Sequence, residues 1–312
     1  MTGMFHYEDV ITDEDYKALN ELKTFHPKRL SLEAGRRKKG KLPHSRVVFA
    51  AADHNARMIN AYQGNPLGLS NRREYLSRLV RILSCEEVDG VEGSPDIIED
   101  LMLLNYLFRT SGRKDFLAGK WIIGTVNRGG LKDVAWEMDD MCTCFTVERL
   151  AELNLDGIKF MLRINPDSEV NKHTLLYCAQ TVNEAVKYQL PIFIEGLYIR
   201  TEAANYVMKT DLESLVKTVG VVGALGCSSQ SKWIELPLNE QYEVAAAATT
   251  NSILVVPDEV GVTKEEVIAE YTKQAGIAPN VRGILLGRNV MYSSDDPAEL
   301  AEAIAKKWHA AE

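Results

Sequence analysis

Two lysines lie inside apolar segments of the sequence, where a charged side chain is costly. Lys232 belongs to the segment SKWIELP (residues 231–237), and Lys159 belongs to GIKFML (residues 157–162). Removal from water lowers the pKa of a lysine, and a second cation nearby lowers it further, so the neutral amine attacks carbonyl carbons. The two segments therefore indicate a lysine nucleophile that forms Schiff bases.

The alternation of side chains along a strand predicts which neighbours share a face of the sheet with each lysine. It places Lys159 on the face of Arg163, and Lys232 on the face of Ile234 in another strand. Both lysines are then expected to point inward together. The alternative for either lysine is a stem that reaches the rim of the protein, or an amine that pairs with a buried acid. The presence of two such lysines favours the chemical interpretation.

The elements that position these lysines alternate in type. Short apolar segments rich in β-branched residues are separated by segments of helical period, a pattern typical of parallel strands with crossover helices. The predicted strands are 47–52, 88–92, 121–126, 157–164, 191–197, one within 226–236, 253–256 and 281–286. The predicted helices are 72–84, 95–110, 147–153, 175–188, 202–209, 240–248, 264–274 and 297–307. Eight strands in this rhythm predict an α/β fold, a single (β/α)8 TIM-type barrel over residues 46–312 with an N-terminal helical extension over residues 1–45.

The composition restricts the class of protein. The chain has 312 residues, 46% of them hydrophobic and 26% charged, with a net charge of −8, which predicts a soluble globular protein without a nucleic-acid partner. Five scattered cysteines without a Cys-x-x-Cys pair predict a reducing compartment and no metal site. No basic leader and no apolar run of bilayer length is found, so a cytoplasmic protein without membrane contact is expected. The basic run RRKKGK (residues 36–41) is expected to be a solvated loop or an oligomer contact.

Polar residues end several predicted strands, which is where the active sites of such barrels lie. They are Asp53, Glu92, Asn127 with Arg128, and Glu195, and of these Glu92 and Asn127 are expected to bind substrate. Asp53 equally fits a helix N-cap or turn, and Glu92 equally fits a partner of a structural arginine. The apolar surroundings of Glu195 predict a cationic partner, because ionised carboxylates avoid such surroundings unless paired.

The last two strand ends predict a phosphate site. Glycines there offer backbone amides, Gly261 after the seventh strand and Gly287 after the eighth, and Arg288 adds a forked cation.

Taken in order, these motifs resemble the class I, Schiff-base-forming aldolases. The resemblance is closest to the tagatose-bisphosphate aldolases and their relatives among bacterial fructose-bisphosphate and deoxyribose-phosphate aldolases, and it spans residues 47–292. The motifs that carry it are VFAAADH (48–54), IKFML (158–162) followed by NPD (165–167), LPIFIE (190–195), KWIELP (232–237) and GRN (287–289).

The resemblance implies a role for each matching residue. Lys232 is the covalent nucleophile, and Lys159 is the second cation that lowers its pKa or holds substrate. Glu195 is the proton-transfer acid and base, and Asp53 orients the lysine and the substrate hydroxyls. Gly287 and Arg288 hold phosphate. The chain departs from the family after the seventh strand, where acids replace a Ser-Gly-Gly turn, and it has no clear equivalent of the family's tyrosine acid.

The implied reaction is reversible cleavage of a phosphorylated ketose or keto-sugar acid to dihydroxyacetone phosphate and an aldehyde. It needs no cofactor and no metal, and a homo-oligomer is expected. A specific candidate substrate is 2-deoxy-5-keto-gluconate 6-phosphate, from inositol breakdown. Asp258 and Glu259 favour the alternative of an unphosphorylated ketose or a 2-keto acid. A non-catalytic barrel that binds sugar phosphates is the alternative from another class.

Overall fold

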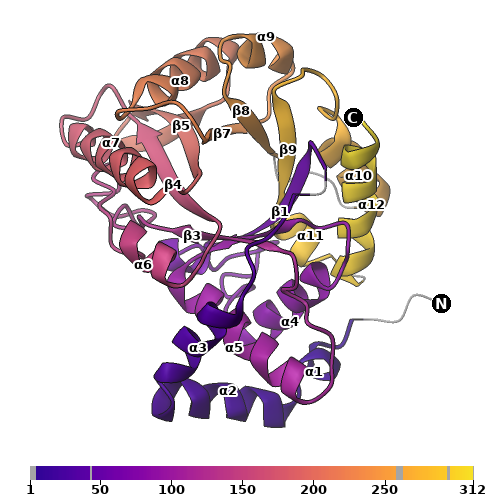
Figure 1. The fold of residues 1–312 in the computed structure, drawn as a ribbon. Helices are drawn as coiled ribbons and strands as arrows, with labels where there is room; N and C mark the ends of the chain where they lie inside the picture. Colours follow the sequence, from indigo (N-terminus) through magenta and orange to yellow (C-terminus); the bar gives the residue numbers. More distant parts are fainter. Residues whose placement is uncertain (1–4, 43, 258–262, 294–295, 312) are drawn as a thin grey trace.

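Eight parallel strands close into a barrel, as the sequence predicts (Figure 1). The computed structural model describes residues 5–42, 44–257, 263–293 and 296–311. The strand order is β4-β3-β2-β1-β9-β8-β7-β5, and β5 pairs back with β4 to complete the circle. The barrel strands are β1 (Val47–Ala52), β2 (Gly90–Gly93), β3 (Trp121–Thr125), β4 (Gly157–Ile164), β5 (Ile192–Glu202), β7 (Lys232–Pro237), β8 (Ser252–Val256) and β9 (Val281–Leu286).

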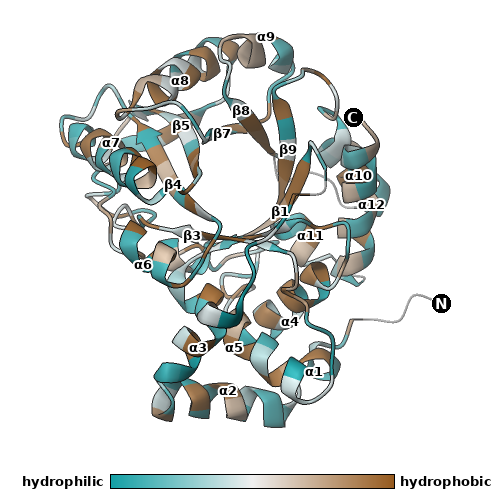
Figure 2. Cartoon of the chain, viewed as in Figure 1, coloured by the Kyte–Doolittle hydropathy of each residue, from teal (hydrophilic) through white to brown (hydrophobic). Residues whose placement is uncertain are grey.

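Helices surround the barrel, with apolar faces against the strands and polar faces outward (Figure 2). Polar side chains cap the amino-terminal ends of several of these helices. For example, Asn71 and Asp211 each accept a hydrogen bond from a backbone amide of the first turn. The helices are α4 (Arg72–Leu83), α5 (Pro95–Thr110), α6 (Val147–Glu152), α7 (Asn171–Tyr188), α8 (Leu212–Ala224), α9 (Tyr242–Ala247), α10 (Lys264–Thr272), α11 (Arg288–Met291) and α12 (Pro297–Ala310), with a 3-10 turn η1 (Asn55–Arg57) after β1. Within the described ranges, no helix is both long and apolar enough to span a bilayer.

The predicted helix over residues 202–209 is wrong, because this segment is a strand. β5 extends to Glu202 and turns directly into β6 (Asn205–Lys209), which pairs with it in antiparallel register. The two turn residues Ala203 and Ala204 have φ of 46° and 66°. Such turns usually carry Asn or Gly, so two alanines give no hairpin signal in the sequence.

Three helices precede the barrel and pack on its outer layer. They are α1 (Tyr7–Val10), α2 (Asp13–Phe25) and α3 (Lys28–Arg36), and Figure 1 shows α2 and α3 lying against α5. Leu19 and Leu30 are buried in this contact. Ion pairs strengthen it at the edges, including one from Lys23 to Asp100 at 2.5 Å.

An apolar layer fills the amino-terminal half of the barrel interior. Phe193 stands at its centre, stacked on Trp233 with 5.3 Å between ring centroids and edge-on to Phe49 at 5.9 Å. The layer, here called the apolar plug, consists of Val47, Phe49, Ile123, Phe193, Leu254 and Leu285, with Leu42, Trp121, Trp233 and Val256 packed against it. The buried acids at the strand ends, Asp53, Glu92, Glu195 and Glu235, lie on the carboxyl-terminal side of this plug.

The basic run 36–41 passes beneath the plug, and its Arg37 is not solvated. The Arg37 guanidinium is almost buried, forms an ion pair with Asp156 and donates to the carbonyl of Lys120 at 2.7 Å. Gly40 lies so close to Trp121 that a Cβ atom would meet the indole ring at 2.4 Å. This part of the run anchors the chain that enters β1, a role that a pattern of charges alone does not indicate.

Candidate functional site

Lys159 lies inside the barrel, directly above the apolar plug, with carboxylates around its amine. Its Nζ atom is 2.5 Å from Glu92, 3.0 Å from Glu195, 3.2 Å from Glu235 and 4.0 Å from Asp53. These carboxylates come from four different strands or strand ends, and the Lys159 side chain is only 3% exposed. The five residues are called the Lys159 cluster below.

Strand alternation explains how the cluster forms. On β4, Phe160 and Leu162 join the core beneath the helices, which turns Lys159 into the barrel as predicted. Glu195 of β5 lies directly opposite Glu235 of β7 in parallel register, so both side chains leave the sheet on the same face. Three of the carboxylates, those of Asp53, Glu92 and Glu195, are residues singled out in the sequence, and the fold brings them together.

The cluster holds positive charge on the lysine. Burial opposes that charge, but the neighbouring carboxylates outweigh it and raise the pKa of Lys159 well above its ordinary value. Burial also raises the pKa of Glu92, and burial with the nearby Glu92 charge raises that of Glu235 well above its usual range. These shifts favour the ammonium form of Lys159 and the protonated form of the Glu92–Glu235 pair.

Asp53 stays ionised in the same surroundings. Burial favours its neutral form, yet the charges of Lys159 and Arg57 lower its pKa to about 2. The adjacent His54 is neutral, because burial is the largest influence and lowers its pKa to about 4. The cluster thus combines a stabilised lysine cation and an ionised aspartate with two glutamates whose pKa values are raised.

Arg57 and Asp140 form a second network that supports the cluster. The Arg57 guanidinium lies 3.7 Å from Asp53 and 2.8 Å from Asp140, and it donates to the carbonyl of Asn127 at 2.6 Å. Asp140 also pairs with Arg163 at 2.9 Å. The carboxylates of Asp53 and Asp140 are both buried. This network fixes the long segment after β3 over the carboxyl ends of the strands. Sequence reasoning overlooked Arg57, although its position four residues after Asp53 was an available signal.

Lys232 does not join the cluster. Its amine donates to the carbonyls of Val222 and Gly223 at 3.0 Å and of Leu225 at 2.7 Å, at the carboxyl end of α8. These three acceptors match the three hydrogens of an ammonium group, and they are where a helix dipole favours a cation. The expectation that both lysines point inward together is wrong, and burial, the main cause of the lowered pKa of Lys232, occurs at a site without carboxylates.

The error concerns which face of β7 is inside. Ile234 and Leu236 join the core beneath the helices, and Lys232 shares their face. Trp233 and Glu235 lie on the other face, so Glu235 enters the cluster although sequence reasoning overlooked it. An acid within a buried strand, opposite Glu195, was the available signal.

Asn127 is committed to the backbone. Its amide nitrogen donates to the Met161 carbonyl at 2.7 Å, and its oxygen accepts from the Met161 amide at 2.9 Å. These bonds hold the end of β3 against β4, and the side chain is fully buried. The predicted contact between Asn127 and substrate is therefore corrected to a positioning role.

Two of the three residues predicted to bind phosphate, Gly287 and Arg288, follow β9 at the carboxyl-terminal mouth of the barrel. Arg288 donates to the Ala61 carbonyl at 3.1 Å, and its charge helps to lower the pKa of His54, which places it near the cluster. The amide of Gly287 donates to the Tyr271 hydroxyl at 3.3 Å. Gly261 lies outside the described residues, as do Asp258 and Glu259.

Comparison with known proteins adds a family and a fold. The protein-family model described as Cgl0159-like matches residues 45–306. The crystal structure of Cgl0159 from Corynebacterium glutamicum is 31% identical over 96% of this chain and 99% of its own, with a TM-score of 0.88. No curated protein matches the sequence significantly.

Two aldolase structures share the fold at lower identity. One is described as a Schiff-base-forming fructose-1,6-bisphosphate aldolase; it is 18% identical over 89% of this chain and 99% of its own, with a TM-score of 0.62. The other is an archaeal fructose-1,6-bisphosphate aldolase with its catalytic lysine bound to a carbinolamine intermediate, 18% identical over 90% of this chain and 100% of its own, with a TM-score of 0.62. At this identity the likeness shows a common barrel fold.

Proposed function

Since the chain belongs to the Cgl0159-like family and has the barrel fold of Schiff-base-forming aldolases, we propose that it is a class I aldolase whose covalent nucleophile is Lys159. The observation that carries this proposal is the position of the amine, within 4.0 Å of four carboxylates inside the barrel. Lys159 thus takes the role that the family resemblance assigns to Lys232, whose amine is occupied by the carboxyl end of α8.

The cluster supports Schiff-base chemistry through its charge. The ammonium group first passes a proton to Glu195, 3.0 Å away and the most exposed carboxylate of the cluster. The neutral amine adds to a ketone to form a carbinolamine; Glu195 then returns its proton to the carbinolamine hydroxyl, and loss of water gives an iminium ion and an ionised Glu195. Two of the three ammonium hydrogens leave in the water, and the positive charge remains on nitrogen. The carboxylates that stabilise the ammonium ion therefore stabilise the iminium ion equally.

Carbon–carbon cleavage then needs a base and an acid. The iminium ion accepts the electron pair of the breaking bond while ionised Glu195 takes the proton of the substrate hydroxyl, which releases an aldehyde and leaves an enamine. Glu195 returns that proton to carbon, and water hydrolyses the resulting iminium ion. Asp53 stays ionised beside Lys159 and orients the amine and the substrate hydroxyls.

The charges favour a substrate with a neutral reacting end and an anionic tail. Carboxylates crowd the depth of the barrel, where a phosphate would be repelled, whereas Arg288 lies nearer the mouth. We assign the carbonyl and hydroxyl groups to the depth and the phosphate to the mouth. Phosphorylated ketoses and keto-sugar acids that yield dihydroxyacetone phosphate fit this order, and 2-deoxy-5-keto-gluconate 6-phosphate is the specific candidate to assay.

Reductive trapping tests the proposal. The protein is incubated with dihydroxyacetone phosphate or candidate ketose phosphates, reduced with borohydride, digested and mapped by mass spectrometry. The expected result is one adduct per chain, on Lys159. An adduct on Lys232 would keep the reaction class but return the nucleophile to β7.

The raised pKa of Lys159 favours a second candidate function, a non-catalytic barrel in which the ammonium ion only binds ligand. It predicts measurable binding of a sugar phosphate with no adduct after reduction. Calorimetric titration of the same ligands, carried out beside the trapping experiment, separates the two functions.

Replacement of Glu195 by glutamine tests the proton-transfer step separately from the covalent attack by Lys159. The variant keeps the size of the side chain but cannot accept a proton, so we expect turnover to fall by about 10²–10⁴-fold. Slow trapping of dihydroxyacetone phosphate on Lys159 should continue, because the amine is still present. The matched control is Glu213→Gln, which alters an exposed pair with Lys217 and should leave turnover unchanged. Wild-type turnover in Glu195→Gln would assign proton transfer to another group.

A further inference from the structure

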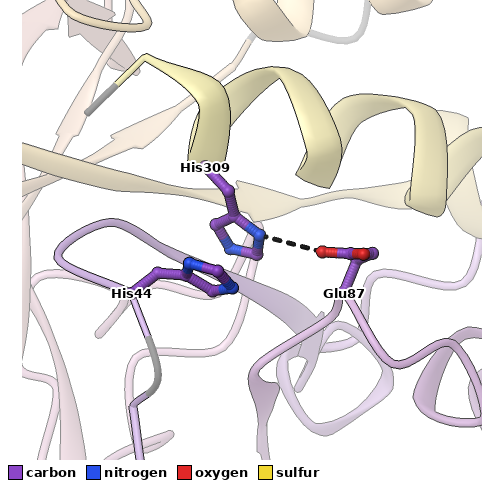
Figure 3. A group of neighbouring side chains, drawn as sticks. All are labelled: His44, Glu87 and His309. Atoms are coloured by element: carbon purple, nitrogen blue, oxygen red, sulfur yellow. Dashed lines mark hydrogen bonds and ion pairs between the residues drawn. The ribbon is translucent and has the colours of Figure 1, made fainter.

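A second cluster of titratable side chains lies at the amino-terminal end of the barrel, opposite the Lys159 cluster. His44 precedes β1, Glu87 lies between α4 and β2, and His309 belongs to the last turn of α12. Figure 3 shows the two imidazole rings stacked beside the Glu87 carboxylate. One nitrogen from each ring and one carboxylate oxygen lie within 4.8 Å of one another. The sequence predicted no metal site, because it shows no cluster of histidines and acids at metal-ligand spacing, and His44 and His309 stand far apart in it.

Asp89 fixes how His309 faces this cluster. Nε2 of His309 lies 3.1 Å from the Asp89 carboxylate, which also accepts the Val48 amide at 2.7 Å and is itself buried. A ring that donates its Nε2 hydrogen to Asp89 directs the lone pair of Nδ1 away from it. Carboxylates orient metal-binding histidines in this way, through the ring nitrogen that does not bind the metal.

The other nitrogen of His309 then faces an acceptor. Nδ1 lies 3.2 Å from the Glu87 carboxylate, so two electron-rich atoms meet and need a positive species between them. A proton is one such species: burial opposes it, but the bonds to Asp89 and Glu87 raise the pKa of His309. A metal ion is the other. One nitrogen of His44 lies within 4.8 Å of the other two donor atoms, and because its ring is stacked on that of His309, His44 binds the ion after its partly exposed ring rotates out of the stack.

We propose that His44, Glu87 and His309 form a zinc site, with Asp89 as the residue that positions His309. Two imidazole nitrogens and one carboxylate oxygen are a ligand set that suits Zn²⁺, and water completes a tetrahedral shell. His309 is almost buried whereas His44 and Glu87 are partly exposed, so the ion reaches the site from solvent. Because the three ligands come from three separate segments, the bound ion joins the chain before β1 to the C-terminal helix α12.

Zinc titration of the full chain tests this site. The protein is treated with chelator, exchanged into buffer without chelator and titrated with ZnCl₂ against a chromophoric competitor, with thermal unfolding measured in parallel. The variants are His44→Ala and Glu87→Gln, both on partly exposed loops where folding should survive. The matched control is His173→Ala, which removes an exposed histidine paired with another acid, Asp139.

We expect one Zn²⁺ per chain, a higher melting temperature with zinc, and unchanged binding in His173→Ala. His44→Ala and Glu87→Gln should each bind zinc at least about tenfold more weakly, since each loses a direct ligand. Zinc that binds both variants as well as the wild type would lie elsewhere, for example on an exposed cysteine, and would overturn the proposal. Failure of the wild type to bind would also overturn it and leave a proton between His309 and Glu87.

Discussion

Lys159→Met should abolish Schiff-base formation, so that borohydride traps no adduct and cleavage slows by about 10⁴–10⁶-fold, the range seen when a covalent nucleophile is removed. Methionine keeps a long side chain above the apolar plug but offers no amine. Mass spectrometry of the reduced protein and a coupled assay for the aldehyde product measure the two effects.

Lys232→Met is the matched control for this experiment. Lys232 caps the carboxyl end of α8, so its loss should lower stability by about 1–2 kcal/mol and leave trapping intact. Lys159→Arg is the second variant. It keeps a cation among the carboxylates, so a loss of trapping in this variant cannot be explained by unfolding for lack of that cation. Normal trapping in either Lys159 variant, or its loss in folded Lys232→Met, would contradict the assignment.

The Lys159→Met protein should also be more stable in mild acid than at neutral pH. Without the lysine, buried glutamates with raised pKa values bind protons in the folded state before the unfolded chain does. Stability contributed in this way is present below the ordinary glutamate pKa and is lost as the pH rises through the raised folded value. The variant should therefore be assayed for folding between about pH 5 and pH 7 before its activity is interpreted.

Arg57→Met should produce the largest loss of stability, about 3–5 kcal/mol, because it breaks the buried ion pairs to Asp53 and Asp140 and leaves each carboxylate only one of its two cations. The Arg57 side chain is 1% exposed and contacts Asp53, Asp140 and the Asn127 carbonyl. Urea unfolding measures the loss, and hydrogen exchange should show the segment after β3 opening first.

Arg200→Met is the control for burial. Arg200 donates two hydrogen bonds to the Asp167 carboxylate. Unlike Arg57, it has 48% of its side chain exposed. Exposed ion pairs add little to stability, so the unfolding midpoint should not change measurably. Equal effects of the two substitutions would mean that the Arg57 network is not the support inferred here.

The sequence predicted the barrel because alternation of apolar strands and amphipathic helices is a local pattern, repeated along the chain. Strand alternation also led to the prediction that Lys159 and Lys232 face inward, and the structure bears this out for Lys159. It failed for Lys232 because strand alternation separates two faces but does not say which one is inside. Comparison of Glu235 with Glu195 across the sheet resolves this, and it requires the register of β5 and β7.

The network of Arg57, Asp140 and Arg163 could not be predicted from local sequence patterns, for a related reason. Asp140 lies in a long segment after β3 with no periodicity, and its contacts with Arg57 and Arg163 join parts of the chain far apart in sequence. The same holds for His44 and His309, which the closure of the barrel brings together. Pairings of this kind follow from topology, and a single sequence carries no separate signal for them.

The apolar plug closes the amino-terminal end of the barrel among the residues that the structure describes. Leu42 and the aromatic rings of Phe193 and Trp233 fill that half, so substrate and products reach and leave Lys159 through the carboxyl-terminal mouth. In the proposed reaction one fragment stays covalently attached to Lys159 until water hydrolyses the iminium ion, whereas the aldehyde is free once the carbon–carbon bond has broken. The aldehyde must then depart before the second product is released, which gives an ordered sequence of product release. Steady-state kinetics would show it as a different pattern of inhibition by each product.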